Sequence, residues 1–334
     1  MRIFPRNFIS ALSLLIPASP LFLASAIPAV GQEADQATRF KTGVTNVQVD
    51  VLVIQKGQLL KGLSRGDFVV HDEGGAQTVL ALEEDSTPLD LVLLIDNSFH
   101  GKGDRNRRNL FAAAADAVRQ MRPKDRVALI SYAPMPHFEQ PLTSDQSEIG
   151  SALNRLEAGG AAPGLAMSDQ AIQWAGWLLA ADAKAAGDTG IARKRAIVVD
   201  SLTRFDFLGG GPNLDPDEPV IQQLWEMDAV LHVTLFGSKG HIESLAESGA
   251  AHVPYYRRGN VQHIAKATGG EVTFDAQKNP LDLIAHIRSS YTLSYKAPEA
   301  KPGEFRHVTV ELSDETKKKY PGAEIKAREG YIAR

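Results

Sequence analysis

The chain has 334 residues and no cysteine. Without cysteine there is no disulfide bond, no thiol nucleophile and no lipid attached to an N-terminal cysteine. The fold must therefore be stabilised by burial of its core alone. Hydrophobic residues make up 43% of the sequence and charged residues 23%, which is typical of a soluble globular protein and sufficient for a sizeable core.

Several signatures of catalysis and nucleotide binding are also missing. The chain has no Gly-x-Ser-x-Gly segment, no His-Glu-x-x-His segment and no glycine-rich loop with phosphate-binding or dinucleotide-binding spacing. It has no run of basic residues, and its net charge of -4 at pH 7 disfavours binding to nucleic acid. We therefore expect no nucleic-acid partner and find no signature of a common enzyme class.

The N-terminal residues have the pattern of a secretory signal peptide. Arg2 and Arg6 precede an apolar stretch over residues 8–26, and small residues follow at positions 29–31. A positive head, an apolar middle and a small-x-small end are the three parts of such a peptide. We predict a signal peptide over residues 1–31, cleaved after Gly31; cleavage after Ala26 is the alternative.

The predicted cleavage implies an exported protein that is periplasmic or extracellular. Prolines at positions 17, 20 and 28 interrupt the apolar stretch and argue against a membrane-spanning helix. We therefore expect no membrane span after cleavage. Removing residues 1–31 takes away two arginines and no acidic residue, so the net charge changes from -4 to -6. Residues 32–41 are polar and predicted to form a loose segment.

The most informative segment covers residues 89–98. Its apolar run, rich in Leu, Val and Ile, ends on Asp96, and Ser98 follows two positions later. Such a run is typical of a strand buried on both faces of a parallel sheet. Ligands bind α/β sheets at the carboxyl ends of the strands. The pattern therefore places Asp96 and Ser98 at a ligand-facing edge.

Strand and helix patterns alternate over residues 87–289. Repeated strand–helix units predict a parallel sheet with helices on both faces. After the strand at 89–96, the expected strands cover residues 126–132, 196–200, 230–236 and 271–274. The expected helices cover residues 105–121, 147–156, 168–186, 219–227, 261–268 and 281–288.

Strand patterns without helices flank this block on both sides. The N-terminal flank, residues 42–86, has three, at 47–54, 67–72 and 78–82, which we expect to form a small antiparallel sheet. The C-terminal flank, residues 290–334, has three more, at 291–295, 307–312 and 324–328. About three strands bury too little apolar surface on their own. We predict that the flanks pair into one β-rich domain, a small β-sandwich.

Two parts of the α/β block resemble a von Willebrand factor A-type domain. They are residues 91–98 with the helix that follows, and the strand at 125–132. The other motifs resemble those of VWFA-related exported bacterial proteins and come in the same order. They are residues 62–70 with Gln77, 264–271, 291–295 and 327–331. The resemblance covers roughly residues 40–333.

This resemblance implies a doubly wound, mostly parallel sheet with one short antiparallel edge strand. It also implies a non-catalytic protein that binds a partner. In many A-type domains a divalent metal is held at the sheet edge by an Asp-x-Ser-x-Ser motif, a Thr of a second loop and an Asp of a third. The open positions on such an ion allow a partner's acidic residue to complete its coordination.

The chain departs from this metal-binding pattern at several positions. Asp96 and Ser98 match the first motif, but His100 replaces its second serine, and the second loop has Ala161 after its glycines. Asp200 is the candidate third-loop acid, with Asp206 as the alternative. Mg²⁺ requires several oxygen ligands. We predict a weakened or absent divalent-metal site at Asp96, Ser98 and Asp200, with His100 as a further ligand, and no other cofactor.

The partner is expected to contact the loops at the same edge. The long stretch over residues 204–219 is interpreted as the main contact loop. Trp174 and Trp177, three positions apart on a predicted helix, are expected to pack in the core or to be half-buried. The predicted contact residues are Phe99, His100, Arg204, Phe205 and Asp206.

Two other functions stay open at this point. An exported hydrolase would use Asp96, His100 and Asp200 around a metal ion that activates water. A structural envelope protein would need no site at the sheet edge at all. The sequence does not indicate an oligomeric state or the identity of the partner.

Overall fold

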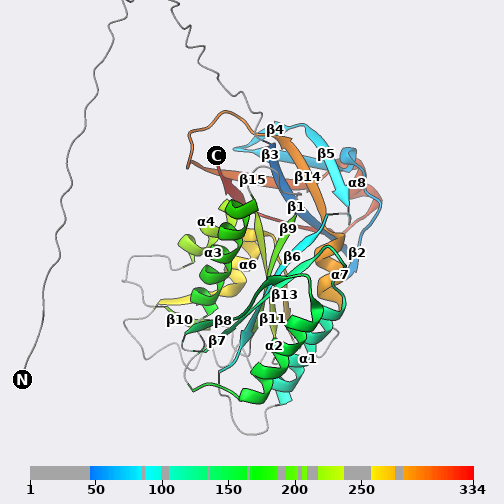
Figure 1. Ribbon diagram of the computed structural model, residues 1–334. Helices are drawn as coiled ribbons and strands as arrows, with labels where there is room; N and C mark the ends of the chain where they lie inside the picture. Colours follow the sequence, from blue (N-terminus) through cyan, green and yellow to red (C-terminus); the bar gives the residue numbers. More distant parts are fainter. Residues whose placement is uncertain are drawn as a thin grey trace, which may run out of the picture. The chain divides into compact units, whose positions relative to one another are not determined.

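A six-stranded sheet is the centre of the computed structural model (Figure 1). The model describes residues 46–84, 87–98, 105–133, 135–163, 166, 168–186, 193–201, 205–208, 217–236, 257–274 and 281–334. The predicted signal peptide and the loose segment lie outside these residues. In spatial order the sheet contains β13 (Val272–Phe274), β11 (Ala229–Leu235), β9 (Lys194–Ser201), β6 (Leu89–Asp96), β7 (Arg126–Tyr132) and β8 (Pro136–Thr143).

The sheet is parallel except for β8, which pairs with β7 in the antiparallel direction. The predicted doubly wound, mostly parallel sheet with an antiparallel edge strand is therefore confirmed. Every residue of β6 is buried, as the apolar run at 89–96 indicates. Strands at the centre of such a sheet are covered on both faces and need apolar side chains on both.

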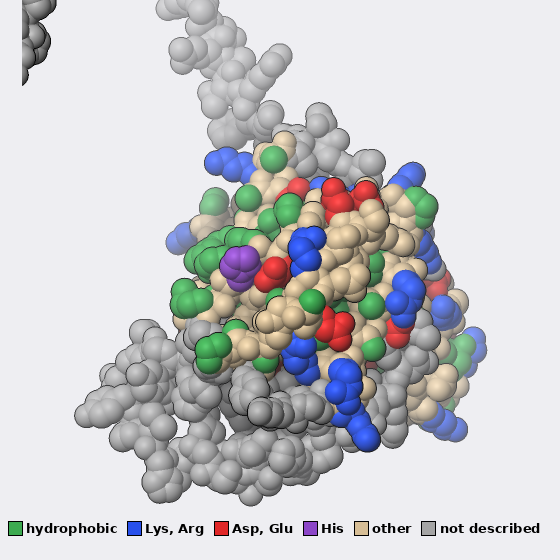
Figure 2. Space-filling model, turned by 60° about the horizontal axis from the view of Figure 1, so that its bottom comes forward, with side chains coloured by type: hydrophobic (Ala, Val, Ile, Leu, Met, Phe, Trp, Pro, Cys, Tyr) green, Lys and Arg blue, Asp and Glu red, His purple; other side chains and the backbone are tan. Residues whose placement is uncertain are grey.

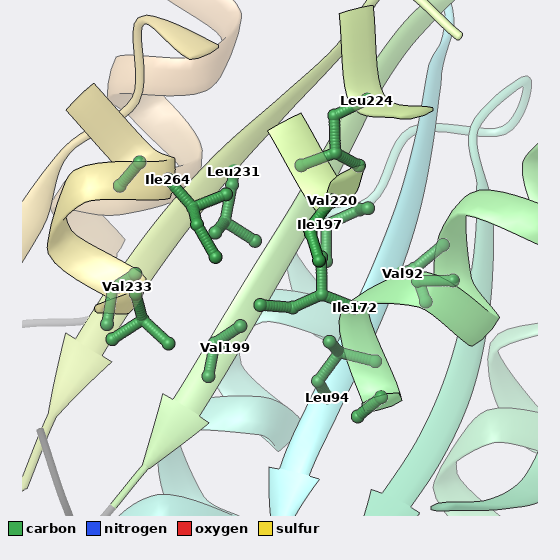
Figure 3. Packing of buried hydrophobic residues seen from close by; sticks show 14 of the residues in the cluster. Val92, Leu94, Ile172, Ile197, Val199, Val220, Leu224, Leu231, Val233 and Ile264 are labelled. Atoms are coloured by element: carbon green, nitrogen blue, oxygen red, sulfur yellow. The ribbon is translucent and has the colours of Figure 1, made fainter. Parts of the chain in front are cut away.

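Helices cover both faces of this sheet (Figure 1). One face carries α3 (Ser168–Ala186), α4 (Glu218–Glu226) and α6 (Val261–Thr268), and the other α1 (Arg105–Arg119), α2 (Gln146–Gly159) and α7 (Leu281–Ser289). Alternate residues of β6 enter the two cores: Val92 and Leu94 the first, Leu91 and Leu93 the second. Figure 3 shows the first core, where Ile172 and Ile264 point at side chains of the strands.

The flanks form two further sheets. One has the order β16 (Ala323–Ala327), β1 (Asn46–Gln55), β14 (Tyr291–Lys296) and β5 (Val79–Glu84), with β2 (Gln58–Leu59) beside β1. The other has the order β17 (Gly330–Ile332), β15 (Phe305–Leu312), β3 (Phe68–Asp72) and β4 (Gly75–Gln77). Each sheet contains strands of both flanks, so the predicted β-rich domain built from the two flanks is confirmed.

One expectation for the N-terminal flank is wrong. Its three main strands do not form a sheet with one another. β1 and β5 lie on either side of β14, and β3 pairs with β15 in the other sheet. The reason is burial: Val49 and Val70 face one shared core with Leu293 and Val310 of the C-terminal flank. Strands of one flank alone would leave that core uncovered.

A buried carboxylate connects strands of the β-rich domain. Asp72, on β3, is almost fully buried and accepts hydrogen bonds from the Nε of Arg306 at 2.7 Å and from the hydroxyls of Tyr295 and Tyr331 at 2.9 Å. A buried carboxylate is tolerated only when its charge is paired and its oxygens are hydrogen-bonded. The short 3-10 helix η1 (Arg65–Asp67) and the helix α8 (Asp314–Lys319) lie outside the two sheets, and Asp67 accepts a hydrogen bond from Thr316.

Glu271 connects the α/β block to the β-rich domain. It precedes β13 and forms ion pairs with Lys326 of β16, at 3.1 Å, and His286 of α7, at 2.6 Å. Burial raises the pKa of Glu271, but the His286 hydrogen bond and the nearby positive charges outweigh it and lower this pKa to about 2. The carboxylate therefore stays ionised and joins three elements.

Two other expectations differ from the structure. Residues 204–219 were expected to form a long loop, but residues 205–208 are the strand β10 (Phe205–Leu208), which pairs with β12 (Arg257–Asn260). The resemblance implies an antiparallel edge strand, but the sequence pattern does not locate it at β8, because the prolines and polar residues of β8 hide any alternation. Over the described part of the chain, no helix is long and apolar enough to span a membrane.

Candidate functional site

The carboxylate of Asp96 lies at the end of β6 and is engaged on both oxygens. Its Oδ1 accepts a hydrogen bond from the backbone N–H of Ser98, at 3.0 Å, and one from the Ser98 hydroxyl. Its Oδ2 accepts a hydrogen bond from the Ser201 hydroxyl, at 3.3 Å. All three residues are buried. The predicted neighbours Asp96 and Ser98 thus lie together at the edge of the sheet.

Asp200 lies on the other face of the sheet. In the register of β6 and β9, Ile95 is beside Asp200, so Asp96 is beside Ser201. Neighbouring residues of a strand point to opposite faces. Burial raises the pKa of Asp200 to about 8, and a hydrogen bond with Thr234, its neighbour on β11, opposes this rise only in part. The Asp96 and Asp200 carboxylates therefore do not converge.

Ser201 is the residue of β9 that faces Asp96, and the sequence reasoning missed it. The sequence signal that identifies Ser201 is the alternation of side-chain direction along the apolar run of β9. Ile197 and Val199 face the same core as Val92 and Leu94, and Ser201 continues that face. Counting in steps of two along 196–201 would have selected Ser201 rather than Asp200.

The second loop of the site follows α2. Ala162 forms a bridge beside Ser98, and its backbone N–H donates to the carbonyl of Asn97 at 2.8 Å. This loop is where the family pattern has a threonine, and here it presents an alanine instead. The methyl group of Ala162 offers no ligand to a cation.

Arg107, in the first turn of α1, contacts the site at Asn97. Its Nη2 donates to the Asn97 Oδ1 and to the carbonyl of Leu156, each at 3.2 Å, and its Nη1 donates to the carbonyl of Glu157 at 3.2 Å. The guanidinium lies over the ring of Phe111, 4.6 Å from its centroid. Arg107 thus anchors the Asn97 turn to the C-terminal end of α2.

An open depression lies where β6 and β7 end. We call it the edge depression; its volume is about 400 Å³. Its lining includes Ser131 and Glu139, which are hydrogen-bonded at 2.7 Å, and His137, whose Nδ1 is 3.2 Å from the Glu139 Oε1. The other lining residues are Asn97, Tyr132, Ala133, Met135, Leu156 and Ala162.

Exposed apolar side chains lie in the lining of this depression and on neighbouring elements. Four large hydrophobic side chains are exposed among the described residues, and three of them, Met135, Phe138 and Trp177, lie on the β7–β8 turn, on β8 and on α3. Figure 2 shows hydrophobic side chains gathered on one side of the face that it displays. Trp174 is half-buried, as expected, but the expectation for Trp177 is wrong, since its side chain points outward and is 58% exposed.

Several predicted contact residues cannot be placed. Phe99, His100 and Arg204 lie outside the described residues. Phe205 and Asp206 belong to β10, but the positions of their side chains lie outside the description too. These five residues stay predictions.

The described residues at this edge offer few oxygen ligands for a six-coordinate cation. A hard divalent ion needs about six oxygen ligands, of which the protein supplies several. Here the hydroxyls of Ser98 and Ser201 donate to Asp96, and Asp200 lies across the sheet. Within the described ranges, no group of three or more His, Asp or Glu side chains lies close enough to hold a metal ion.

One comparison with known protein families matches part of the α/β block. Residues 91–199 match the family model of the von Willebrand factor type A domain. No curated protein matches the chain in sequence.

Solved structures resemble the chain at low sequence identity. An aerotolerance-related membrane protein from Bacteroides fragilis is 15% identical; the match covers 60% of this chain and 98% of that one, with a TM-score of 0.41. BatB from Bacteroides thetaiotaomicron is 14% identical, with coverages of 60% and 97% and a TM-score of 0.41. Human COPII-coat protein Sec24c is 10% identical, with coverages of 75% and 44% and a TM-score of 0.41.

Proposed function

We propose that this chain, whose residues 91–199 form a von Willebrand factor type A domain, is an exported, non-catalytic module that binds a protein partner. The partner is bound at the carboxyl edge of the six-stranded sheet, at the edge depression. Export rests on the leader pattern of residues 1–31. The metal site at this edge is weakened or absent.

The observation that carries the proposal is the edge depression together with the exposed apolar side chains in its lining and on the neighbouring elements β8 and α3. Met135 lines the edge depression, Phe138 lies on the other face of β8, and Trp177 lies on α3, which contacts β8. Leu80 is the other exposed large hydrophobic among the described residues. Exposed apolar groups that cluster next to a polar depression mark sites of protein association. Ligands of α/β sheets bind at this same edge.

The described side chains do not support the alternative of a metal-dependent hydrolase. Such an enzyme needs Asp96 and Asp200 to hold one ion that activates water. The two carboxylates are on opposite faces of the sheet, and both oxygens of Asp96 accept hydrogen bonds from this chain's own donors. A binding role needs no such convergence.

The substitution Ala162→Arg tests this proposal. A long side chain at Ala162 would fill the edge depression from the loop beside Ser98, so we expect capture of the partner by the tagged chain to fall at least tenfold. Leu80→Arg, which adds the same charge on β5, is the matched control and should leave capture unchanged. Capture is measured by crosslinking and quantitative mass spectrometry, with thermal melting to verify folding.

Capture should be equal in EDTA and in excess Mg²⁺, because the described residues at this edge supply too few oxygen ligands for such an ion. Equal capture by the Ala162→Arg variant and the unmodified chain would contradict the proposed binding edge. Loss of capture in EDTA would instead contradict the weakened metal site.

A further inference from the structure

We propose that the partner segment bound at this edge carries a lysine or arginine next to an apolar side chain, and that it packs around the edge strand β8. The apolar side chain would contact Phe138 and Trp177, and the cation would pair with Glu139. This inference rests on the proposed function and names the chemistry of the partner.

The apolar half of the surface is formed by the rings of Phe138, Trp174 and Trp177, which we call the aromatic ledge. Phe138 stacks on Trp174 with ring centroids 5.0 Å apart, and 45% of Phe138 is still exposed. Trp174 packs against the core beneath, which holds the ledge in place. Trp177 has neither a ring contact nor a hydrogen bond with the described residues. A fixed, uncovered aromatic surface is typical of binding hot spots.

The charged half is the carboxylate of Glu139. Its Oε1 accepts a hydrogen bond from the Ser131 hydroxyl and faces the Nδ1 of His137, while its Oε2 has no partner among the residues described. The side chain is only 19% exposed, so its position is held by its neighbours. No lysine or arginine forms an ion pair with it in the described part of the chain. A lysine or arginine of a partner would form an ion pair with this carboxylate.

The two halves lie on opposite faces of β8. Phe138 is beside Ile130, whose side chain enters the α3 core, whereas His137 is beside Ser131, on the side of the edge depression. His137 and Phe138 point to opposite faces of β8 and are both exposed, so a partner can reach both faces. Met135, which is 63% exposed and lines the depression, lies at the turn between β7 and β8.

The partner does not bind by adding a strand to the sheet. β8 contains Pro136 and Pro141, and its pairing with β7 has two register shifts. Prolines and irregular register block the regular hydrogen bonding that a further strand would need. Recognition must therefore come from side chains, which are the groups that the aromatic ledge and Glu139 provide.

The small exposed apolar area of the described residues favours a short segment over a second copy of this chain. At exposures of 63%, 45% and 58%, the side chains of Met135, Phe138 and Trp177 present roughly 300 Å² in total. A stable dimer buries about 800 Å² on each partner. Lysine and arginine combine an apolar stem with a cation, and the cation also binds aromatic faces. A basic residue beside an apolar one fits both halves.

The test is selection from a random peptide library displayed on phage, with the full chain immobilised. We expect enriched peptides to carry Lys or Arg adjacent to an aliphatic or aromatic residue. The Kd of an enriched peptide should rise at least tenfold in Trp177→Ala and in Glu139→Gln. Leu80→Ala and Glu299→Gln remove an exposed apolar group and an exposed charge on the β-rich domain, and should leave the Kd unchanged. Glu139→Lys should select acidic peptides instead.

Three results would overturn the inference. They are the absence of enriched peptides, enrichment without basic residues, and a Kd that Trp177→Ala changes no more than Leu80→Ala does. If any of them occurred while Ala162→Arg still abolished partner capture, this inference would fail and the proposed function would stand. If Ala162→Arg also had no effect on capture, the proposed function itself would fail.

Discussion

Gly270→Ala is expected to destabilise the protein by at least about 3 kcal/mol. A Cβ atom at Gly270 would overlap the carbonyl group of Leu231 on β11, with the carbonyl carbon 2.6 Å away. Gly270 and the Leu231 carbonyl meet through their backbones, and neither backbone can move aside without disrupting β11. The Val233 N–H of β11 donates a hydrogen bond to the carbonyl of Glu271 at 2.8 Å. The close approach brings the end of α6 onto the sheet.

The matched control is Gly150→Ala, in the middle of α2. No atom lies within 4 Å of a Cβ built there, and alanine favours helix, so stability should rise by about 0.5–1 kcal/mol. Urea denaturation followed by circular dichroism measures both variants. If Gly270→Ala were as stable as the unmodified chain, the packing of the α6–β13 turn against Leu231 would be wrong.

Asp200→Asn is expected to make the protein more stable at alkaline pH, by roughly 3–5 kcal/mol at pH 9. Burial raises the pKa of Asp200 to about 8 in the folded state, whereas an unfolded chain has an aspartate pKa near 4. The folded state therefore holds a proton that the unfolded state releases between about pH 4 and pH 8. Stability must fall as pH rises through this window, and asparagine removes the effect.

The measurement is the free energy of unfolding between pH 5 and pH 9 for the two proteins. We expect their difference to be small at pH 5 and to grow with pH. Glu299→Gln, which removes an exposed carboxylate, should follow the unmodified chain throughout. If the free energy of unfolding depended on pH in the same way for Asp200→Asn and the unmodified chain, Asp200 would be ionised in the folded state. Its side chain would then not be buried at the end of β9.

The parts of the fold that sequence alone predicts are those with strong local patterns. The strand at 89–96 and the helix at 168–186 are found with the expected bounds, because a fully apolar run and a long helical periodicity have no competing interpretation. The pairing of the flanks also follows, since each has too few strands to bury a core. Which strand pairs with which depends on contacts between residues over 200 positions apart, and no local pattern records these.

The site is less predictable than the fold. Asp96 and Ser98 are found because they end a buried run, whereas Asp200 is the candidate because the family resemblance implies an acidic residue in the third loop. Which residue of β9 lies beside Asp96 depends on the face of the sheet to which its side chain points. That face follows from strand register rather than from residue type. Phe138 lies on a strand with two prolines, so its exposure and its stacking on Trp174 could not be inferred from sequence.

The most direct test of the central claim, that a protein partner binds at the carboxyl edge of the sheet, is site-specific photocrosslinking in cells that export the protein. A photoreactive phenylalanine analogue is placed at Met135, beside the edge depression, and separately at Leu80, which is also exposed but lies on β5. We expect a discrete crosslinked partner from position 135 and none from position 80. The same crosslinks from both positions, or crosslinks from position 80 alone, would contradict the claim.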